Sequence, residues 1–299
     1  MTQHSATPQT DNPPLGIMLM VGFCILAPFS ETFVKLLGAS IPLLQVVFAR
    51  FFAQLFLIRP RLWTNRQNGW AARGILPWII LRSILHLCAI ACFFLSLRFL
   101  PLADALAIAY VMPFLILGAG FFVGDRPTPL QLLLCLIGFV GTLMVVQPSF
   151  ANVGLPALLP LIVAVLFTGF VLITRKFANR VDPIDLQAIN GAIAVITMVP
   201  LIIVGAWWAI PEMMMIQVTP LQWFYLAMVG ALGTIAHLCM TWSLKLARPS
   251  VVAPAQYLEI PFGAMFGLVV FSEFPNGMAA AGIVVVIAAG LTVLATNRR

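Results

Sequence analysis

Long apolar runs, separated by short polar segments, occupy almost the whole chain. A helix needs roughly 20 apolar residues to cross the hydrocarbon of a bilayer. Ten windows meet or approach this length and are predicted to be helices: Leu15–Leu37, Ile41–Ile58, Ile75–Leu97, Leu102–Val123, Leu130–Val146, Leu155–Thr174, Ile184–Trp208, Leu221–Leu244, Val251–Phe271 and Met278–Ala295. The runs are continuous and lack strand alternation, which excludes a transmembrane β-barrel. We therefore predict an all-α membrane protein.

The second half of the chain repeats features of the first about 148 residues later. Five windows fit in each period, and because five is odd, each helix and its counterpart must cross the bilayer in opposite directions. Inverted repeats of this kind build transporters, with the substrate site near the bilayer midplane between the halves. The matching features are Ser96-Leu97-Arg98 with Ser243-Leu244-Lys245, Pro113 with Pro261, Asp125-Arg126-Pro127 with Glu273-Phe274-Pro275, and Gly141 with Gly290.

These features predict ten transmembrane helices in a five-plus-five inverted repeat. Residues 1–14 are expected to form a flexible cytoplasmic tail, residues 15–150 the first repeat and residues 151–297 the second. No stretch is long or polar enough to form a soluble domain.

Composition agrees with this fold and predicts its orientation. Of 299 residues, 62% are hydrophobic and only 8% charged. With the N-terminus inside, twelve of the 16 Lys and Arg residues fall on the cytoplasmic side and two on the outer side. This positive-inside bias places both termini in the cytoplasm. The net charge of +7 is thus a topology signal and does not indicate nucleic-acid binding. All five Cys lie inside apolar windows, so a disulfide framework is not expected.

Ionisable side chains inside the windows are candidates for a functional site, because a charge at the centre of a membrane helix costs about 2.5–3.5 kcal/mol on insertion scales. Glu259 and Arg50 lie near the middle of their windows, and Arg82 and His86 lie one turn apart on the third. Glu259 either contacts a substrate ammonium or carries a proton, or it forms a structural ion pair with Arg50 or Arg82. We interpret both arginines as structural charges.

Glu31, in the outer third of the first window, is a second candidate for proton coupling. Lys35 lies one turn later, so an ordinary i,i+4 ion pair is the alternative interpretation of this carboxyl.

Pro113 and Pro261 lie at matching positions in the fourth and ninth windows. Each proline lacks a backbone donor and leaves the carbonyl four residues earlier, that of Ala109 or Tyr257, without its usual partner. Both are expected to kink their helices, either as gates at the repeat interface or as static bends.

A polar and aromatic set around these prolines is expected to bind substrate. Its rings can stack on a flat apolar group, and its polar atoms can hydrogen-bond amino and carboxyl groups. Of the two histidines in repeated His-Leu-Cys triplets, His86 is preferred to His237 as a cavity residue. A metal site is not expected, because residues two apart point to opposite sides of a helix. The set comprises Ser83, His86, Tyr110, Trp242, Gln256, Tyr257 and Glu259.

This pattern resembles the drug/metabolite transporter superfamily, specifically its EamA-type exporters, and within it the aromatic amino-acid exporter branch. The resemblance implies a central cavity between the third, fourth, eighth and ninth helices, with parts of the first, second, sixth and seventh. It implies that the fifth and tenth helices are peripheral. The residues that carry it are Lys35, Arg50, Pro113, Pro261, the stretch Pro101-Leu-Ala-Asp-Ala-Leu-Ala107, and the acidic residue before a Pro-containing turn at Asp125 and Glu273.

We expect a multi-pass exporter of small metabolites in a bacterial inner membrane, with aromatic or other apolar amino acids as substrates, working by alternating access. One alternative is a carrier of phosphorylated metabolites or nucleotide sugars, whose anion Arg50, Arg82 and His86 could hold. Another is an exporter of organic cations or drugs. A channel would need polar rings, usually from several subunits.

The chain contains neither Gly-x-Ser-x-Gly nor His-Glu-x-x-His, so we expect no enzyme and no catalytic residues. We expect no cofactor and no metal, and a monomer or weak dimer whose partners are its substrate and the lipid bilayer. No nucleotide-binding motif is present, so any driving energy would come from a gradient. Proton coupling is left open.

Overall fold

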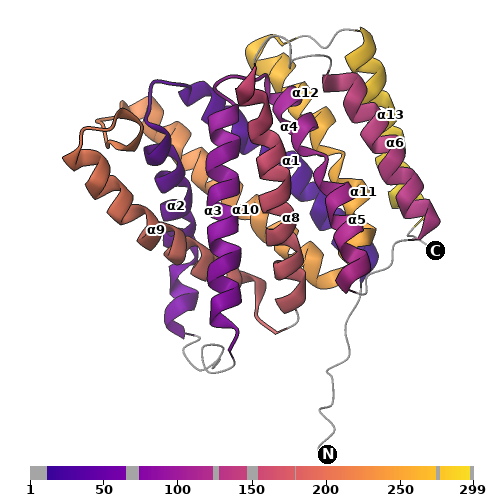
Figure 1. The fold of residues 1–299 in the computed structure, drawn as a ribbon, viewed down its shortest axis with the longest axis horizontal. Coiled ribbons are helices and arrows are strands. Elements are labelled where there is room, and N and C mark those ends of the chain that lie inside the picture. The colour runs from indigo at the N-terminus through magenta and orange to yellow at the C-terminus, as the bar shows by residue number, and fades with distance from the viewer. Residues whose placement is uncertain are drawn as a thin grey trace, which may run out of the picture.

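The computed structural model describes residues 12–64, 74–123, 128–146, 154–178, 180–273 and 277–296. Within these ranges the regular secondary structure is entirely helical (Figure 1). Residues 1–11 of the predicted tail and the Asp125-Arg126-Pro127 motif lie outside the described residues. The same holds for several of the basic residues that predict the orientation, among them Arg66, Arg73 and Arg126. The cytoplasmic position of the termini stays a prediction.

Every apolar window of the sequence coincides with a helix or with two consecutive helices. The first half contains α1 (Pro13–Leu37), α2 (Leu43–Thr64), α3 (Leu76–Ser96), α4 (Leu102–Ala109), α5 (Met112–Val123) and α6 (Pro129–Val146). The second half contains η2 (Leu155–Leu158), α8 (Leu159–Phe177), α9 (Pro183–Trp207), η3 (Pro211–Met213), α10 (Pro220–Leu246), α11 (Pro249–Gln256), α12 (Glu259–Phe271) and α13 (Gly277–Thr296).

Seven of these segments are long and apolar enough to cross a membrane, where α4–α5 and α11–α12 each count as one span. Three shorter apolar segments lie in α2, α6 and α13. The prediction of an all-helical membrane protein is therefore confirmed, and the number of ten crossings stays a prediction.

Local signals in the sequence determine where several helices begin and end. The side chain of Asn12 accepts a hydrogen bond from the Leu15 N–H at 3.2 Å and caps α1. At the start of α10, Thr219 and Gln222 form a capping box. Helix α1 ends at Gly38, whose φ of 54° is a conformation that favours glycine.

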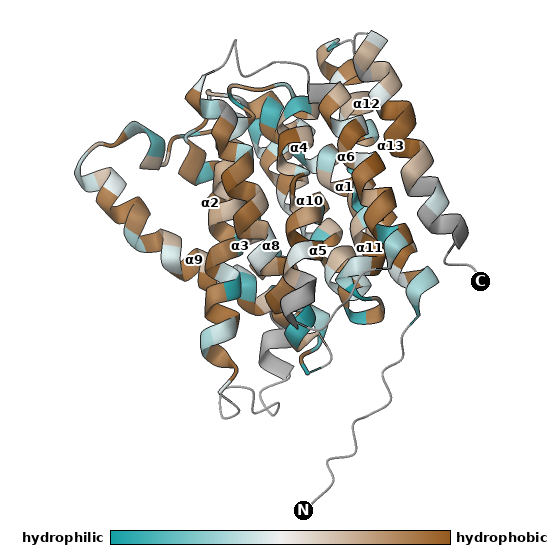
Figure 2. Ribbon diagram, turned by 45° about the vertical axis from the view of Figure 1, so that its right-hand side comes forward, coloured by the Kyte–Doolittle hydropathy of each residue, from teal (hydrophilic) through white to brown (hydrophobic). Residues whose placement is uncertain are grey.

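The helices consist mostly of hydrophobic residues, and hydrophilic residues are more frequent toward the helix ends and loops (Figure 2). Ile196 is 69% exposed and Val269 is 74% exposed. Large exposed aliphatic side chains on helices of this length are typical of surfaces that contact lipid.

Helices from the two halves pack against each other reciprocally. Helix α1 packs on α10. Their counterparts in the other half are α8 and α3, and these two helices also pack on each other. Helix α2 packs on α9, and α6 lies beside α13 at one edge of the bundle (Figure 1). A Cβ at Gly141 of α6 would lie 2.9 Å from the Gly282 carbonyl oxygen of α13, so these two helices approach closely. This reciprocal packing is the arrangement expected of two related halves.

Candidate functional site

The fourth and ninth apolar windows are both broken in the middle, close to their matching prolines. Helix α4 ends at Ala109 and α5 begins at Met112, so Pro113 is the second residue of α5. Helix α11 ends at Gln256 and α12 begins at Glu259, which makes Pro261 the third residue of α12. Proline fits the first turn of a helix, where its missing N–H is not needed. The predicted interruptions are therefore present, and a gating role for either proline stays a prediction.

The second break retains short-range backbone hydrogen bonds. The Tyr257 carbonyl, which loses its usual donor at Pro261, accepts the N–H of Ile260 at 3.2 Å. Broken membrane helices leave polar backbone groups at membrane depth, which are tolerated where the chain lines a cavity or is buried in protein.

A cavity lies between α1, α3, α4, α8, α10 and α12, beside both breaks. The space between its walls, including its opening, is about 530 Å³. Most of the lining is apolar. Helix α3 contributes residues from its C-terminal half and α8 from its first half, whereas the α1 residues run from Phe23 to Glu31. The lining residues are Phe23, Ala27, Glu31, Ala89, Ile90, Phe93, Leu106, Ala109, Tyr110, Met112, Val163, Ala164, Phe167, His237 and Glu259.

Two carboxyl groups line this cavity. Glu259, at the first position of α12, accepts a hydrogen bond from the Tyr110 hydroxyl at the end of α4. The amino end of a helix favours a negative charge, so this position suits a carboxylate. Glu31 also lines the cavity, and its Oε2 is buried without a hydrogen-bond partner. Both predicted candidates for proton coupling therefore face one space.

The ion pair expected between Glu31 and Lys35 is not what the structure contains. Lys35 forms an ion pair with Glu273, which follows α12, and so joins the last turn of α1 to the C-terminal end of α12. Helix spacing alone favoured the i,i+4 partner, but the long-range contact leaves Glu31 facing the cavity.

The two arginines bind neutral partners. Arg50 donates to Gln54 Oε1 at 2.9 Å and lies 3.2 Å from His237 Nδ1. Arg82 donates to Thr174 Oγ1 at 2.7 Å. Both arginines are buried, and the structure pairs Glu259 with Tyr110 and with neither of them. The alternative of a structural ion pair at Glu259 is therefore not the observed arrangement.

A polar network extends from Arg50 through α2, α9 and α10. Gln54 donates to the Gln187 carbonyl oxygen at 2.6 Å, and Gln187 in turn donates to Thr241 Oγ1 at 2.6 Å. Hydrogen bonds of this kind join membrane helices where hydrocarbon offers no other partner. The structural role expected of Arg50 agrees with this network.

Of the two histidines, His237 lines the cavity and His86 does not. The His86 ring stacks on Phe170 with centroids 4.4 Å apart, and its Nδ1 lies 2.9 Å from Asn190 Nδ2. The rings of His86 and His237 are themselves 4.5 Å apart. Position along the helix favoured His86 as the cavity residue. The repeated His-Leu-Cys triplet was the only signal in the sequence that pointed to His237.

Within the predicted substrate-binding set, Tyr110 and Glu259 line the cavity, and the other members lie outside its walls. Ser83 donates to the Ile79 carbonyl oxygen at 2.9 Å within its own helix. The Tyr257 ring is fully buried against Gly138 of α6, and Gln256 is buried beside it with both amide atoms unpartnered. Trp242 is half-buried on α10. Direct substrate contact stays a prediction for all seven residues of the set.

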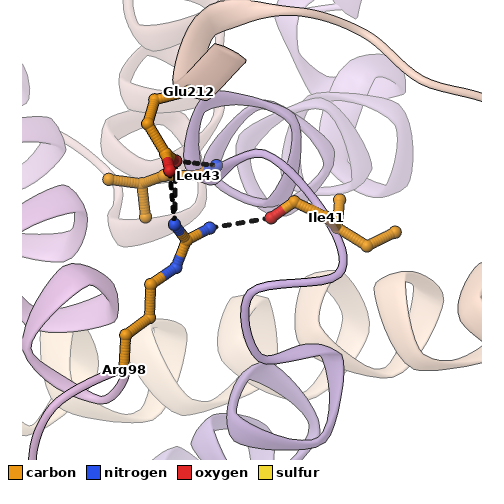
Figure 3. Close-up of polar contacts among 4 residues, drawn as sticks. All are labelled: Ile41, Leu43, Arg98 and Glu212. Carbon is orange, nitrogen blue, oxygen red and sulfur yellow. Dashed lines mark hydrogen bonds and ion pairs between the residues drawn. The ribbon is translucent and has the colours of Figure 1, made fainter.

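A polar clamp, formed by Ile41, Leu43, Arg98 and Glu212, joins the segments that follow α1 and α3 to η3 (Figure 3). Arg98 Nη1 donates to both carboxylate oxygens of Glu212, at 2.9 and 2.8 Å, and Nη2 donates to the Ile41 carbonyl oxygen at 2.7 Å. The Leu43 N–H donates to the same carboxylate at 3.2 Å. This clamp joins the two halves of the chain.

Comparison with known proteins identifies relatives over most of the chain. The pseudopaline exporter CntI of Pseudomonas aeruginosa strain UCBPP-PA14 is 26% identical over 286 residues, which are 95% of this chain and 97% of that protein. The S-adenosylmethionine uptake transporter of Rickettsia felis is 23% identical and covers 89% of this chain and 87% of its own length. The riboflavin transporter of Rhizobium johnstonii is 28% identical, covering 88% of this chain and 82% of that protein.

A solved crystal structure has the same fold, with a TM-score of 0.68 and 19% sequence identity over 95% of this chain and 97% of that one. The profile of the EamA-like transporter family matches twice, at residues 14–147 and 155–295, so the chain belongs to that family.

Proposed function

We propose that this membrane transporter exports small metabolites by alternating access, with aromatic or other apolar amino acids as its substrates. The cavity at the two helix breaks carries this proposal, because discontinuous helices at a repeat interface are where secondary transporters bind their substrates. A bacterial inner membrane and cytoplasmic termini belong to the same proposal, as does the inverted orientation of the two halves.

The lining of the cavity supports an apolar substrate with a charged end. Phe23, Phe93 and Phe167 supply rings on which a flat side chain can pack. Glu31 and Glu259 supply carboxyl groups that can bind an ammonium or exchange a proton. The relatives named for pseudopaline, S-adenosylmethionine and riboflavin indicate that the family accommodates chemically diverse cargo, so the test must include more than amino acids.

Organic cations are a second candidate, because both acidic groups that line the cavity would favour a positive charge. Phosphorylated metabolites or nucleotide sugars are less favoured. Arg50 and Arg82, which would hold their phosphates, lie behind the walls and bind neutral partners.

Alternating access in this proposal uses the broken helices as hinges. Helix α4 packs on α12, and α5 packs on α11, so each half-helix has its partner on the same side of the breaks. The Tyr110–Val111 and Tyr257–Leu258 segments can then bend while the half-helices keep their contacts. Pro113 and Pro261 keep the helices from closing across these segments.

The test is counterflow in proteoliposomes that contain the purified protein. Labelled tryptophan would be measured against unlabelled leucine, S-adenosylmethionine, riboflavin, a sugar phosphate and tetraethylammonium. Exchange inhibited selectively by aromatic and apolar amino acids is the expected result. Exchange supported only by the sugar phosphate or by tetraethylammonium would replace the substrate assignment with that class. Absence of exchange for every compound would overturn the proposed function.

A further inference from the structure

Besides the two carboxyl groups, the cavity lining contains a histidine that belongs to a buried basic cluster with unused hydrogen-bonding atoms. His237 is the only basic side chain among the described residues that line the cavity, and it is 5% exposed. Behind it lie Arg50, at 3.2 Å from its Nδ1, and His86, at a ring distance of 4.5 Å. His237 Nε2 has no partner, although it is buried.

The contact with Arg50 determines which kind of group His237 can bind. A guanidinium only donates hydrogen bonds, so where Arg50 bonds to His237 Nδ1, at 3.2 Å, Nδ1 is the acceptor. The same Nδ1 lies 2.9 Å from the Gly233 carbonyl oxygen, to which it would donate in the other tautomer. We assign the tautomer that accepts from Arg50, because a hydrogen bond from a charged donor is the stronger of the two. In the neutral ring that leaves the proton on Nε2, which is then a donor. Nε2 thus requires an acceptor from the ligand, such as a carboxylate oxygen.

Charge favours an anionic acceptor. Arg50 is 1% exposed and bonds to Gln54 and His237, which are uncharged in this arrangement. A buried cation whose partners are neutral creates a positive potential in a medium of low dielectric constant. Glu31 and Glu259 line the same cavity, and a bound cation would favour their ionised, negative forms. The cavity therefore offers groups for both charges of a ligand.

We infer that the cavity binds zwitterionic metabolites, with the ammonium or other cation at Glu259 and Glu31 and a carboxylate at His237 supported by Arg50. This inference rests on the proposed transport function and names the substrate class of that same cavity. It makes His237 a residue that selects for carboxylates. Zwitterions would contact both His237 and the acidic groups, whereas cations would contact Glu31 and Glu259 alone.

The test compares tryptophan with two analogues that each lack one charge. Tryptamine has no carboxylate, and indole-3-propionate has no ammonium. Counterflow of labelled tryptophan and S-adenosylmethionine, both of which carry an amino and a carboxyl group, would be measured beside that of riboflavin. We expect exchange of at least one zwitterion, and inhibition of that exchange by each one-charge analogue at concentrations roughly tenfold or more above those of tryptophan, since one hydrogen bond to a charged group is lost.

Two substitutions at one position separate binding from support of the fold. His237→Asn places an amide oxygen where Nδ1 accepts from Arg50 but removes the Nε2 donor, whereas His237→Gln places an amide nitrogen near Nε2. We expect His237→Asn to weaken tryptophan roughly tenfold or more, leaving tryptamine unchanged, and His237→Gln to restore part of the loss. Glu259→Gln is the matched change at an acidic group, and it should weaken tryptamine and leave indole-3-propionate unchanged.

The outcomes distinguish this inference from the proposed function. Exchange of riboflavin alone, or equal inhibition by tryptophan and both analogues, would overturn the zwitterion assignment and leave transport standing. Equal weakening of tryptophan and tryptamine by His237→Asn would show a role in folding and overturn the carboxylate site, as would no change for either compound. Absence of exchange for every compound would overturn both.

Discussion

A methyl group added at Gly138 should destabilise the protein through the break between α11 and α12. Gly138 lies on α6, and a Cβ there would be 2.6 Å from Tyr257 Cδ2, about 0.8 Å short of an ordinary contact at 3.4 Å. The Tyr257 ring is fully buried, so it cannot rotate into open space. Overpacking of this kind costs about 1–3 kcal/mol. Alanine has a better helix propensity than glycine by roughly 1 kcal/mol, which offsets part of the cost. We expect Gly138→Ala to lower the free energy of unfolding by up to about 2 kcal/mol.

The assay is equilibrium unfolding in mixed micelles with increasing SDS, followed by circular dichroism. Gly118→Ala in α5 is the matched control, because a Cβ at Gly118 meets nothing within 4 Å, and it should be neutral or slightly stabilising. In a Tyr257→Ala background the side-chain atoms that the added Cβ would meet are absent, so Gly138→Ala should no longer destabilise, with a coupling energy of about 1–3 kcal/mol. An equal loss in both backgrounds would refute the assignment of the cost to Tyr257. So would identical behaviour of Gly138→Ala and Gly118→Ala.

Three further predictions concern transport and the polar clamp. Glu259→Gln should abolish any dependence of proteoliposome transport on a pH gradient, and an unchanged dependence would remove Glu259 as the coupling site. Pro261→Ala should slow turnover more than it weakens substrate binding, because it allows the break to close into a continuous helix, whereas an unaltered turnover number would make the proline a static bend. Glu212→Gln should cost less than about 1 kcal/mol in the SDS titration, since Glu212 is 58% exposed. Arg98→Gln should cost more because it also loses the Ile41 carbonyl, and equal costs would contradict that contribution.

The helices and their interruptions could be predicted because their causes are local. A run of apolar residues determines a membrane helix whatever surrounds it, as the agreement of α3 with the Ile75–Leu97 window illustrates. Proline removes a backbone donor wherever it occurs, so Pro113 and Pro261 indicated both breaks before any contact was known. The family also followed from the order and spacing of such local signals along the chain.

The pairing of polar groups could not be predicted from spacing, because the partners are far apart in sequence. Lys35 and Glu273 are separated by 238 positions, and Tyr110 and Glu259 by 149. Sequence spacing offers Lys35 only the nearer carboxyl of Glu31, one turn away. The separation of Tyr110 and Glu259 is close to the repeat period, so matching breaks that meet at the centre would have predicted their proximity.

The choice between the two histidines failed for a different reason. Depth was judged from position along the helix, which says nothing about the side of the helix that a neighbour covers. Phe170 and Asn190 cover His86, whereas the ring of His237 reaches the cavity wall. Only tertiary packing distinguishes two histidines with the same local sequence.

Tyr257 makes one of the contacts between the helices at the edge of the bundle and the break beside the cavity. Tyr257 packs on Gly138 of α6 and ends α11, two residues before Glu259 begins α12. Pro261 removes the backbone donor that would bond to the Tyr257 carbonyl in a continuous helix, so a displacement of the Tyr257 ring can change the direction of α12. Helix α12 carries Glu259, whose partner Tyr110 lies at the other break, and the two breaks are therefore mechanically linked. Since α6 packs on α13, this edge can hold the first half-helix of the ninth span in place while the second half-helix moves. The peripheral helices would then be the fixed support against which the hinge works, and the close contact at Gly138 is the point where that support acts.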